Sequence, residues 1–274
     1  MRRATALLRA THLAPSLLVT GLTAALGWQV GLGVQTAAVA AAVAAGQASI
    51  GWSNDWLDAG RDAAAGRRDK PVASGEVGAA TLRTAALSAL TLCVGLSALL
   101  GPVPAAVHLT GVAAGWAYNA RLKATVASPL PYALAFALVP GVLVVVSLPG
   151  APLPPLWVPA AGALLGVGAH FLNAAPDLEV DRAQAVRGLP QRLGERASVW
   201  SGLGLLAAGM AVIVLGPPGP PAPALLLTGA LALILLVAAL VALARQASRL
   251  GFQAAMGVAA LAVLGLLSAG TTLP

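Results

Sequence analysis

The chain has 274 residues, of which 58% are hydrophobic and only 9% are charged. Soluble domains contain about 45–50% apolar and about 25% charged residues, so a soluble fold of this length would lack the polar side chains that cover its surface. The net charge of +7 would suggest a nucleic-acid partner for a soluble protein. Beside so much apolar sequence it indicates basic loops at a membrane instead, and we expect no nucleic acid. The single cysteine, Cys93, excludes a disulfide framework.

Apolar stretches long enough to cross a bilayer follow one another along the whole chain. A helix needs about 20 predominantly apolar residues to span the hydrocarbon layer, and Gly/Pro clusters separate several of these stretches. The expected spans lie near 12–31, 36–56, 79–100, 104–121, 129–148, 156–175, 198–216, 223–244 and 251–271. The sequence therefore predicts an all-α fold, a multi-pass transmembrane bundle of about nine helices that forms a single domain over 1–274.

The basic residues indicate how this bundle is oriented. With nine spans, all 16 Lys and Arg residues fall on one side of the membrane, whereas the alternate loops near 32–35, 101–104, 149–155 and 216–222 carry no charge. The positive-inside rule makes the charged side cytoplasmic. We therefore expect a cell-membrane protein with a cytoplasmic N-terminus. We interpret the first apolar run as a transmembrane helix and not as a signal peptide.

The acidic residues are confined to two short segments. All nine Asp and Glu residues lie in 55–76 or in 177–195, and each segment begins at the cytoplasmic end of an expected helix. Carboxylates beside apolar spans are costly and usually functional. Ordinary charged helix ends are the alternative interpretation, but surface solvation would have spread the acidic residues over all the cytoplasmic loops.

The two acidic segments also match each other. A constant offset of 119 residues superposes seven positions of residues 54–76, called motif one, on residues 173–195, called motif two. The matching pairs are Asn54 and Asn173, Asp58 and Asp177, Asp62 and Asp181, Arg68 and Arg187, Pro71 and Pro190, Gly75 and Gly194, and Glu76 and Glu195. The match suggests a parallel internal repeat or convergence on one way of binding a ligand. Either origin places two equivalent sites on one face of the membrane.

The spacing within each motif fits a metal site. Residues at i, i+4 and i+8 lie along one helix face, so the Asn and the two matching Asp residues of each motif share one stripe. Four carboxylates that face one cavity repel each other and need cations. Carboxylate and amide oxygens without His or Cys suit Mg²⁺. The predicted metal ligands are Asn54, Asp58, Asp62, Asn173, Asp177 and Asp181, of which the four aspartates are also the predicted catalytic residues.

Basic residues lie beside both motifs and fit a phosphate ligand. They are Arg61, Arg68, Lys70, Arg182 and Arg187. Guanidinium and ammonium groups bind the phosphate oxygens that a metal leaves free. Acids, Mg²⁺ and basic residues together would hold a diphosphate at the cytoplasmic mouth of an apolar bundle. An isoprenyl diphosphate, with its lipophilic tail, matches both the polar mouth and the apolar interior.

These residues resemble the UbiA superfamily of intramembrane prenyltransferases. Residues 54–62, Asn-Asp-Trp-Leu-Asp-Ala-Gly-Arg-Asp, fit its NDxxDxxxD motif, and residues 177–181 fit its second motif, DxxxD. Segments 70–75 and 188–194 are similar to the stretches that follow the two family motifs, and residues 118–123 resemble its Tyr-x4-Lys loop. The similarity extends over about 9–200.

The resemblance implies an enzyme that transfers a prenyl group from an isoprenyl diphosphate to a lipophilic, often aromatic, acceptor in the lipid bilayer. Mg²⁺ and basic residues would stabilise the departing diphosphate, and the bundle would keep water away from the allylic cation. The implied main metal ligands are Asn54, Asp58, Asp177 and Asp181, with Asp62 and Asn173 in support. The implied diphosphate ligands are Arg9, Arg68, Lys70, Lys123 and Arg187.

The residues leave other functions open. A membrane terpene cyclase would use the same diphosphate site without an acceptor, and a non-catalytic lipid-diphosphate binder would need the binding groups alone. In a cation transporter the ion site tends to lie near the bilayer midplane, whereas the acids here lie at one end of their helices. Tyr118, Tyr132 and Phe171 either line a prenyl or acceptor pocket or serve as packing, and His170 is expected to be a packed histidine.

Overall fold

The structure, a computed structural model, describes residues 2–244 and 250–269, and this part of the chain is helical without any strand. The long helices are α2 (Leu13–Gln29), α3 (Gln35–Ala64), α4 (Ala79–Leu99), α5 (Pro102–Ala120), α8 (Trp157–Ala174), α11 (Glu195–Leu215), α12 (Pro223–Ala244) and α13 (Leu250–Ala269). Another runs as α6 (Pro129–Ala137), η2 (Leu138–Val142) and α7 (Leu143–Val146). The shorter elements are α1 (Arg2–Arg9), η1 (Leu122–Ala124), η3 (Ala175–Asp177), α9 (Leu178–Ala183) and α10 (Leu189–Leu193). The predicted all-α fold class is confirmed.

Each expected span overlaps one of the long helices. An apolar stretch in lipid must satisfy its backbone groups internally, and a helix does so within one segment. The largest difference in a boundary is in α3, which continues past the expected end at 56 to Ala64 and so carries the acidic residues of motif one on a regular helix. The last expected span reaches 271, which lies outside the described residues.

Length and composition mark six described helices as able to cross a membrane. They comprise α4, the α6–α7 segment, α8 with its continuation, α11, α12 and α13. A seventh is added if α1 and α2, which meet at a bend of 64°, form one span. This bend lies next to His12, whose φ of 55° is left-handed. The protein is therefore a multi-pass membrane protein. The count of nine spans and the cytoplasmic N-terminus stay predictions.

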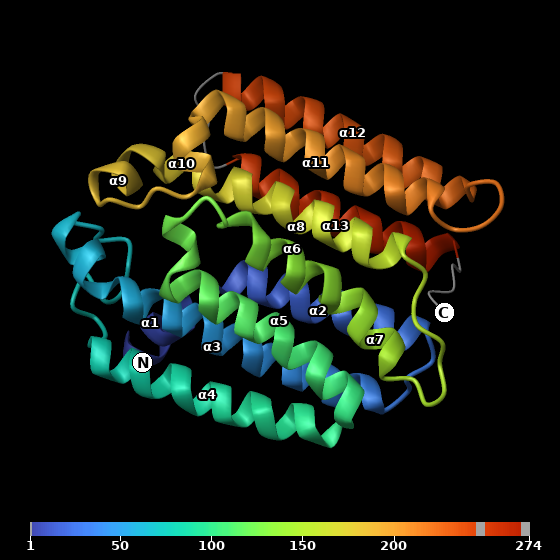
Figure 1. Cartoon of the computed structure of the whole chain (residues 1–274), viewed down its shortest axis with the longest axis horizontal. Coiled ribbons are helices and arrows are strands. Elements are labelled where there is room, and N and C mark those ends of the chain that lie inside the picture. Colours follow the sequence, from blue (N-terminus) through green and yellow to red (C-terminus); the bar gives the residue numbers. More distant parts are fainter. Residues whose placement is uncertain (1, 245–249, 270–274) are drawn as a thin grey trace.

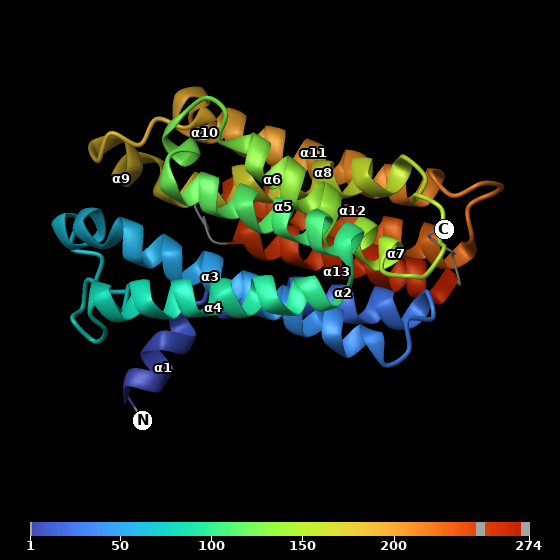
Figure 2. The ribbon, with the colours of Figure 1, turned by 60° about the horizontal axis from the view of Figure 1, so that its bottom comes forward.

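The helices form a closed bundle in which the first and last long helices meet. Helix α3 packs between α2 and α4, α8 packs against α6 and α11, and α13 lies against α12, α2 and α8 (Figures 1 and 2). Small residues allow the close approaches, as is usual for helices in membranes. A Cβ added to Gly202 of α11 would lie 2.6 Å from Leu172 Cγ and 3.1 Å from Gly168 O of α8.

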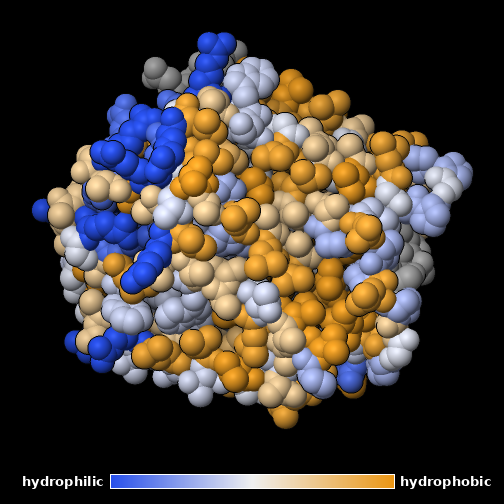
Figure 3. All heavy atoms as spheres, in the orientation of Figure 1, coloured by the Kyte–Doolittle hydropathy of each residue, from blue (hydrophilic) through white to orange (hydrophobic). Residues whose placement is uncertain are grey.

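Polar and apolar surfaces are separated along the bundle. Hydrophilic residues gather at the left end of the molecule in Figure 3, where Figures 1 and 2 show α9, α10 and the C-terminal end of α3. Large apolar side chains cover much of the rest of this face, and the exposed apolar side chains of α12 include Leu227 and Ile234. Exposed apolar helix faces are stable against lipid. The polar end is therefore where an ionic site meets water.

Candidate active site

Motif one begins with an asparagine that is oriented by its neighbours. Asn54 Nδ2 donates to Asn119 Oδ1 on α5 at 3.1 Å. Asn119 in turn donates to Ile50 O at 2.9 Å and to Ser53 Oγ at 2.8 Å. Because both amide protons of Asn119 are used on α3, its oxygen faces Asn54 and fixes the Asn54 amide. The carbonyl oxygen of Asn54 is then the atom turned away from Asn119.

Asp58 lies one helix turn further along α3 and is held by two cations. Lys123 of η1 forms an ion pair with both of its carboxylate oxygens, and Arg61 pairs with Oδ1 from the next turn. The Lys123 side chain is 9% exposed. Burial lowers the pKa of Lys123, and Asp58 acts in the opposite direction. Lys123, a predicted diphosphate ligand, thus reaches the first acidic motif from a different helix.

Asp62 is the buried carboxylate at the end of motif one. It is 8% exposed, and its Oδ2 has no hydrogen-bond partner within the described residues. A buried ionised oxygen without a partner is costly. This atom, together with the all-oxygen set of the two motifs, fits a hard divalent cation such as Mg²⁺. The described residues contain no preformed cluster of three metal-ligating side chains, so a metal would have to draw the ligands together.

Asp55, which follows Asn54, is a buried carboxylate with basic partners of its own. It is 1% exposed and accepts a hydrogen bond from Lys70 Nζ at 2.7 Å, and its Oδ1 lies 3.3 Å from His12 Nε2. This contact joins α3 to the bend between α1 and α2. Lys70 was predicted to bind diphosphate, and in this structure its ammonium is bound to Asp55.

Motif two is built on a broken helix. Helix α8 ends at Ala174, the backbone passes through η3, which contains Pro176, and α9 then carries Asp181. Asp181 Oδ2 accepts a hydrogen bond from Gln191 Nε2 of α10 at 2.7 Å. Asp177 is more open, with a side chain that is 46% exposed. Pro176 accounts for the break, because proline lacks the N–H that a continuing helix would use.

The two motifs are joined at the polar end. Arg67, which follows α3, lies with Nη1 3.5 Å from Asp177 Oδ1 of motif two, and it donates to both carboxylate oxygens of Asp69 at 3.0 and 3.1 Å. The bond with Asp69 raises the pKa of Arg67 and lowers the pKa of Asp69. A second link runs from Gln184 Nε2 to Arg61 O at 3.1 Å. The predicted metal ligands of the two motifs therefore face a shared region.

Aromatic side chains lie beneath this region. The rings of Tyr118 and Tyr132 pack edge to face with centroids 5.1 Å apart, and their hydroxyls are hydrogen-bonded. The charges of Asp181 and Asp58 both act on the Tyr118 hydroxyl, so it lies within electrostatic reach of both motifs. Asn173 is hydrogen-bonded to Tyr132. We call Tyr118 and Tyr132 the aromatic floor.

His170 supports the aromatic floor from α8. Its ring centroid is 4.7 Å from that of Tyr132, and its side chain is buried. Ser128 Oγ lies 3.1 Å from His170 Nε2 and also accepts a hydrogen bond from the Leu189 N–H at 3.0 Å. Ser128 thus connects the loop of motif two to the helix beneath it. The packed role expected for His170 fits these contacts.

The remaining predicted diphosphate ligands lie at the rim. Arg9 is bound to Glu76, with Nη2 to Oε1 at 3.0 Å. Hydrogen bonds from Ser74 and Arg9 lower the pKa of Glu76. Arg68 and Arg187 are exposed. Within the described residues Arg68 makes no ion pair or side-chain hydrogen bond, and the same holds for the side chain of Arg187. The roles of these residues stay predictions.

Sequence reasoning passed over several residues that shape the site. Arg67 and Gln191 contact predicted metal ligands, but their counterparts at the offset of 119 are Val186 and Val72. A search for matching positions therefore could not select them. Asn119 lies inside the segment 118–123 that resembles the family's Tyr-x4-Lys loop, but that pattern specifies only the first and last residues of the segment. A second polar residue within one turn of Tyr118 was the available signal for it.

Comparison with known proteins gives the family. A model of the UbiA prenyltransferase family matches residues 13–261. The chain therefore belongs to the UbiA prenyltransferase family, as its resemblance implied. No curated protein matches its sequence.

Solved structures share the fold. The apo structure of a UbiA homolog from Aeropyrum pernix K1 has a TM-score of 0.72 at 18% identity, over 92% of this chain and 96% of that one. A UbiA homolog from Archaeoglobus fulgidus bound to GPP and Mg²⁺ has a TM-score of 0.66 at 17% identity, over 95% and 98% of the two chains. A structure of digeranylgeranylglyceryl phosphate synthase has a TM-score of 0.66 at 14% identity, over 98% and 99%. Identities this low show the fold alone.

Proposed function

We propose that the protein transfers a prenyl group from an isoprenyl diphosphate to a lipophilic acceptor, with Mg²⁺ as cofactor, at the cytoplasmic end of the bundle in the cell membrane. Membership of the UbiA prenyltransferase family supports the reaction class. The acceptor belongs to the membrane phase, because the interior of the bundle and its outer faces are apolar.

The observation that carries the proposal is the meeting of two acidic motifs at one end of an apolar bundle, surrounded by cations. Arg67 reaches Asp177 at 3.5 Å, and Lys123 and Arg61 pair with Asp58. Carboxylates alone would repel a diphosphate. Carboxylates can bind Mg²⁺ and the neighbouring basic side chains can bind phosphate oxygens, so the two together indicate a diphosphate that binds with its metal. The relative bound to GPP and Mg²⁺ is consistent with such a ligand here.

The oxygen-rich motifs are suited to hold the metal. Asn54 presents a fixed amide, Asp62 has an oxygen without a partner, and Asp177 is open to solvent. When bound, Mg²⁺ would neutralise the diphosphate and so make it a better leaving group. The proposed main ligands are Asn54, Asp58, Asp177 and Asp181, with Asp62 and Asn173 in support.

Basic and aromatic side chains would bind the diphosphate and stabilise the allylic cation. Lys123 and the exposed Arg68 and Arg187 would bind phosphate oxygens and stabilise the negative charge that develops as the allylic C–O bond breaks. Tyr118 and Tyr132, which pack against each other, would offer π electrons to an allylic cation. The apolar bundle would keep water from that cation until the acceptor captures it.

The test is diphosphate release by purified protein in detergent, with geranylgeranyl diphosphate, Mg²⁺ and a pool of aromatic acceptors. Asp58→Asn and Asp177→Asn should each reduce release by roughly 100-fold or more, because each removes a group that stabilises transition-state charge. Glu179→Gln is the matched control. Glu179 lies on α9 together with Asp181, but it is outside the i, i+4 stripe formed by Asn173, Asp177 and Asp181.

The outcomes separate the candidate functions. Mg²⁺-dependent release with a prenylated product in the mass spectrum supports the transferase. Release that does not need any acceptor would point to a terpene cyclase. Absence of release from any diphosphate, in protein shown to be folded, would contradict the proposal and favour a binder or a transporter. A loss in Glu179→Gln as large as in Asp177→Asn would contradict the assignment of the motif.

A further inference from the structure

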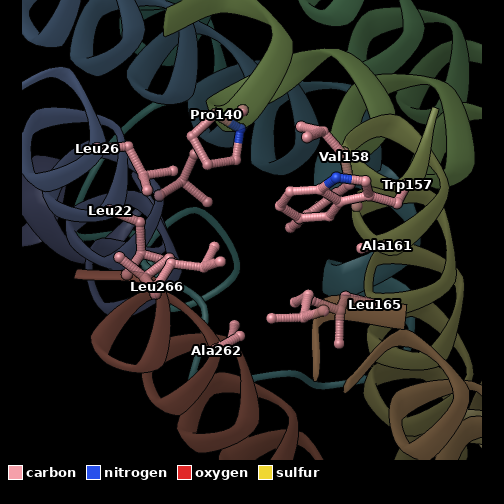
Figure 4. A pocket seen from close by; sticks show the side chains of 16 residues that line it. Leu22, Leu26, Pro140, Trp157, Val158, Ala161, Leu165, Ala262 and Leu266 are labelled. Carbon is pink, nitrogen blue, oxygen red and sulfur yellow. The ribbon is translucent and has the colours of Figure 1, made fainter. Parts of the chain in front are cut away.

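Two hollows in the described part of the chain differ in character. One lies between α2, η2, α8 and α13 and is lined almost entirely by hydrocarbon (Figure 4). The other has a volume of about 280 Å³ and lies where α9 and α10 are joined, at the polar end of the bundle. Its lining residues are Arg182, Arg187, Gln191 and Arg192. We call it the arginine pocket, and its composition favours an anion.

Two of the three arginines are fixed by backbone carbonyl groups. Arg182 Nε donates to Gln191 O at 2.7 Å, and Arg192 Nε donates to Arg187 O at 2.8 Å. A guanidinium group has five N–H donors, so each of these side chains is oriented and keeps most of its donors for a ligand. The third arginine, Arg187, is exposed beside them. The pocket therefore presents several N–H donors around one hollow.

The positive charge of the arginine pocket is not paired with acidic side chains of the protein. Within the part of the chain that the structure describes, none of its three arginines forms an ion pair, and none of its lining residues is acidic. The basic residues around motif one behave differently, since Lys123 pairs with Asp58 and Arg67 with Asp177. Like charges around one hollow repel each other, and an anion relieves that repulsion. The pocket is thus distinct in its electrostatics from the acidic motifs.

The arginine pocket lies at the depth of the interface between a bilayer and water. Helix α10 ends at Leu193, and α11, which is able to cross a membrane, begins at Glu195. Leu193 is exposed, and so is Trp200, which lies five residues, or about 8 Å, along α11. Exposed tryptophan side chains are typical of the membrane interface. The pocket is therefore bordered by apolar side chains that contact lipid.

We propose that the arginine pocket binds the phosphate group of an anionic phospholipid. Arg182 and Arg192 donate to the phosphate oxygens, as basic side chains at a membrane surface do for anionic head groups. The acyl chains continue along the outer face of α11 below Trp200, where Gly204 and Ala208 are exposed and leave space. A soluble anion can make the polar contacts but not the apolar ones. This inference does not depend on the proposed function, and its test uses Arg182 and Arg192 because neither is a proposed diphosphate ligand.

The experiment measures lipid binding to the full chain in detergent by native mass spectrometry. Dioleoyl phosphatidylglycerol and dioleoyl phosphatidylcholine have the same acyl chains, but only the first has a net negative charge. Arg192→Gln removes one charge of the pocket, and Arg182→Gln combined with Arg192→Gln removes two. Arg192→Lys keeps the charge but loses the Nε bond to the backbone. Arg83→Gln is the matched control, because Arg83 is exposed on α4, across the bundle from α10 (Figure 1).

Phosphatidylglycerol should bind the wild-type protein about tenfold or more tightly than phosphatidylcholine. Arg192→Gln should weaken this binding by about fivefold and the double variant by about 25-fold, whereas Arg192→Lys and Arg83→Gln should have little effect. If the double variant does not fold, Arg192→Gln carries the test. A wild-type protein without preference for phosphatidylglycerol, or an equal loss in Arg83→Gln, would overturn the inference. An Arg192→Lys protein as weak as Arg192→Gln would do so too, because the loop and not the charge would then matter.

Competition separates a lipid from a soluble anion. Inorganic phosphate and inorganic diphosphate are each added without Mg²⁺ at the concentration of the lipid. Phosphatidylglycerol should stay bound, because its acyl chains add apolar contacts that a soluble anion lacks. Displacement of the lipid by either anion would overturn the assignment and make the arginine pocket a site for soluble phosphates.

Discussion

The predicted metal ligands of motif one lie on the continuous helix α3, whereas those of motif two lie on both sides of the break between α8 and α9. In motif one the carboxylate of Asp58 is held by Lys123 and Arg61. Its counterpart Asp177 is 46% exposed and has Arg67 at 3.5 Å as its ion-pair partner within the described residues. The same residue types at the same spacing therefore have different surroundings. The first carboxylate of motif one is held by two cations of the protein, and the first carboxylate of motif two is open to solvent.

The backbone after the two motifs is nevertheless alike. The Arg67 N–H donates to Asp62 O at 3.0 Å, and at the offset of 119 the Val186 N–H donates to Asp181 O at 2.9 Å. The residues before these donors, Gly66 and Ala185, both have positive φ, at 64° and 60°. This is the Schellman geometry that ends a helix. Such detailed agreement supports the proposal of an internal repeat over convergence.

The largest difference between the motifs should appear in stability. Asp58→Asn leaves the buried Lys123 with one ion-pair partner fewer and should cost roughly 3 kcal/mol, because removing one member of a buried pair strands the other. Asp177→Asn removes a half-exposed charge and should change stability by less than about 1 kcal/mol. Thermal unfolding in detergent measures both.

A double variant shows whether the cost of Asp58→Asn comes from the unpaired charge of Lys123 or from the loss of the Asp58 carboxylate itself. Lys123→Met combined with Asp58→Asn removes both charges, so it should be more stable than Asp58→Asn alone, as expected for residues in contact. Equal destabilisation by Asp58→Asn and Asp177→Asn would show that the two motifs are not held differently, and the comparison would fail.

A smaller effect should come from the loop that holds motif two. Gly188→Ala would place a Cβ 2.5 Å from Lys123 O and 2.7 Å from Gln191 Oε1. Since Gln191 binds Asp181, we expect a loss of about 1–3 kcal/mol from overpacking together with weaker binding of Mg²⁺ or diphosphate.

The counterpart of Gly188 in motif one provides the control. It is Asp69, whose side chain is 52% exposed. Asp69→Ala should therefore change stability by less than about 1 kcal/mol. Unfolding temperature and the Mg²⁺ dependence of diphosphate binding are the two measurements. A Gly188→Ala protein with unchanged values of both would show that the loop moves aside freely.

The sequence predicts the helices because hydropathy and length act locally. Each long helix is found within a few residues of its expected position, apart from the longer C-terminal part of α3. The acidic stripe of motif one is equally local, since it follows from the spacing of Asn54, Asp58 and Asp62 on one regular helix. The break at Pro176 also follows from one residue.

The partners of the charged side chains could not be predicted in this way. Lys70 is bound to Asp55 and Arg9 to Glu76, although both were expected at the diphosphate. The paired residues lie 15 and 67 positions apart in the sequence, so spacing along one helix could not reveal them.

The smallest predicted effect concerns the left-handed residue that ends each motif helix. Glycine adopts this conformation without strain, whereas the Cβ of alanine makes it sterically unfavourable. Nothing lies within 4 Å of a Cβ added to Gly66, so substitution there tests the backbone alone. Gly66→Ala should cost about 1 kcal/mol, and Ala185→Gly should add a few tenths to about 1 kcal/mol, since relief of strain outweighs the greater freedom of the unfolded chain.

The opposite signs of these two changes make the test specific to the shared geometry. At about 1 kcal/mol each, the unfolding temperature should move by roughly 2–4 °C in opposite directions. Diphosphate binding should stay the same in both variants, because neither residue carries a functional side chain. If both substitutions destabilise the protein, Ala185 does not hold the conformation of Gly66, and the argument for a repeat loses its backbone evidence. If the signs are opposite, the two helices end in the same way in solution, and the difference between the motifs lies in their side-chain partners and in the break at Pro176.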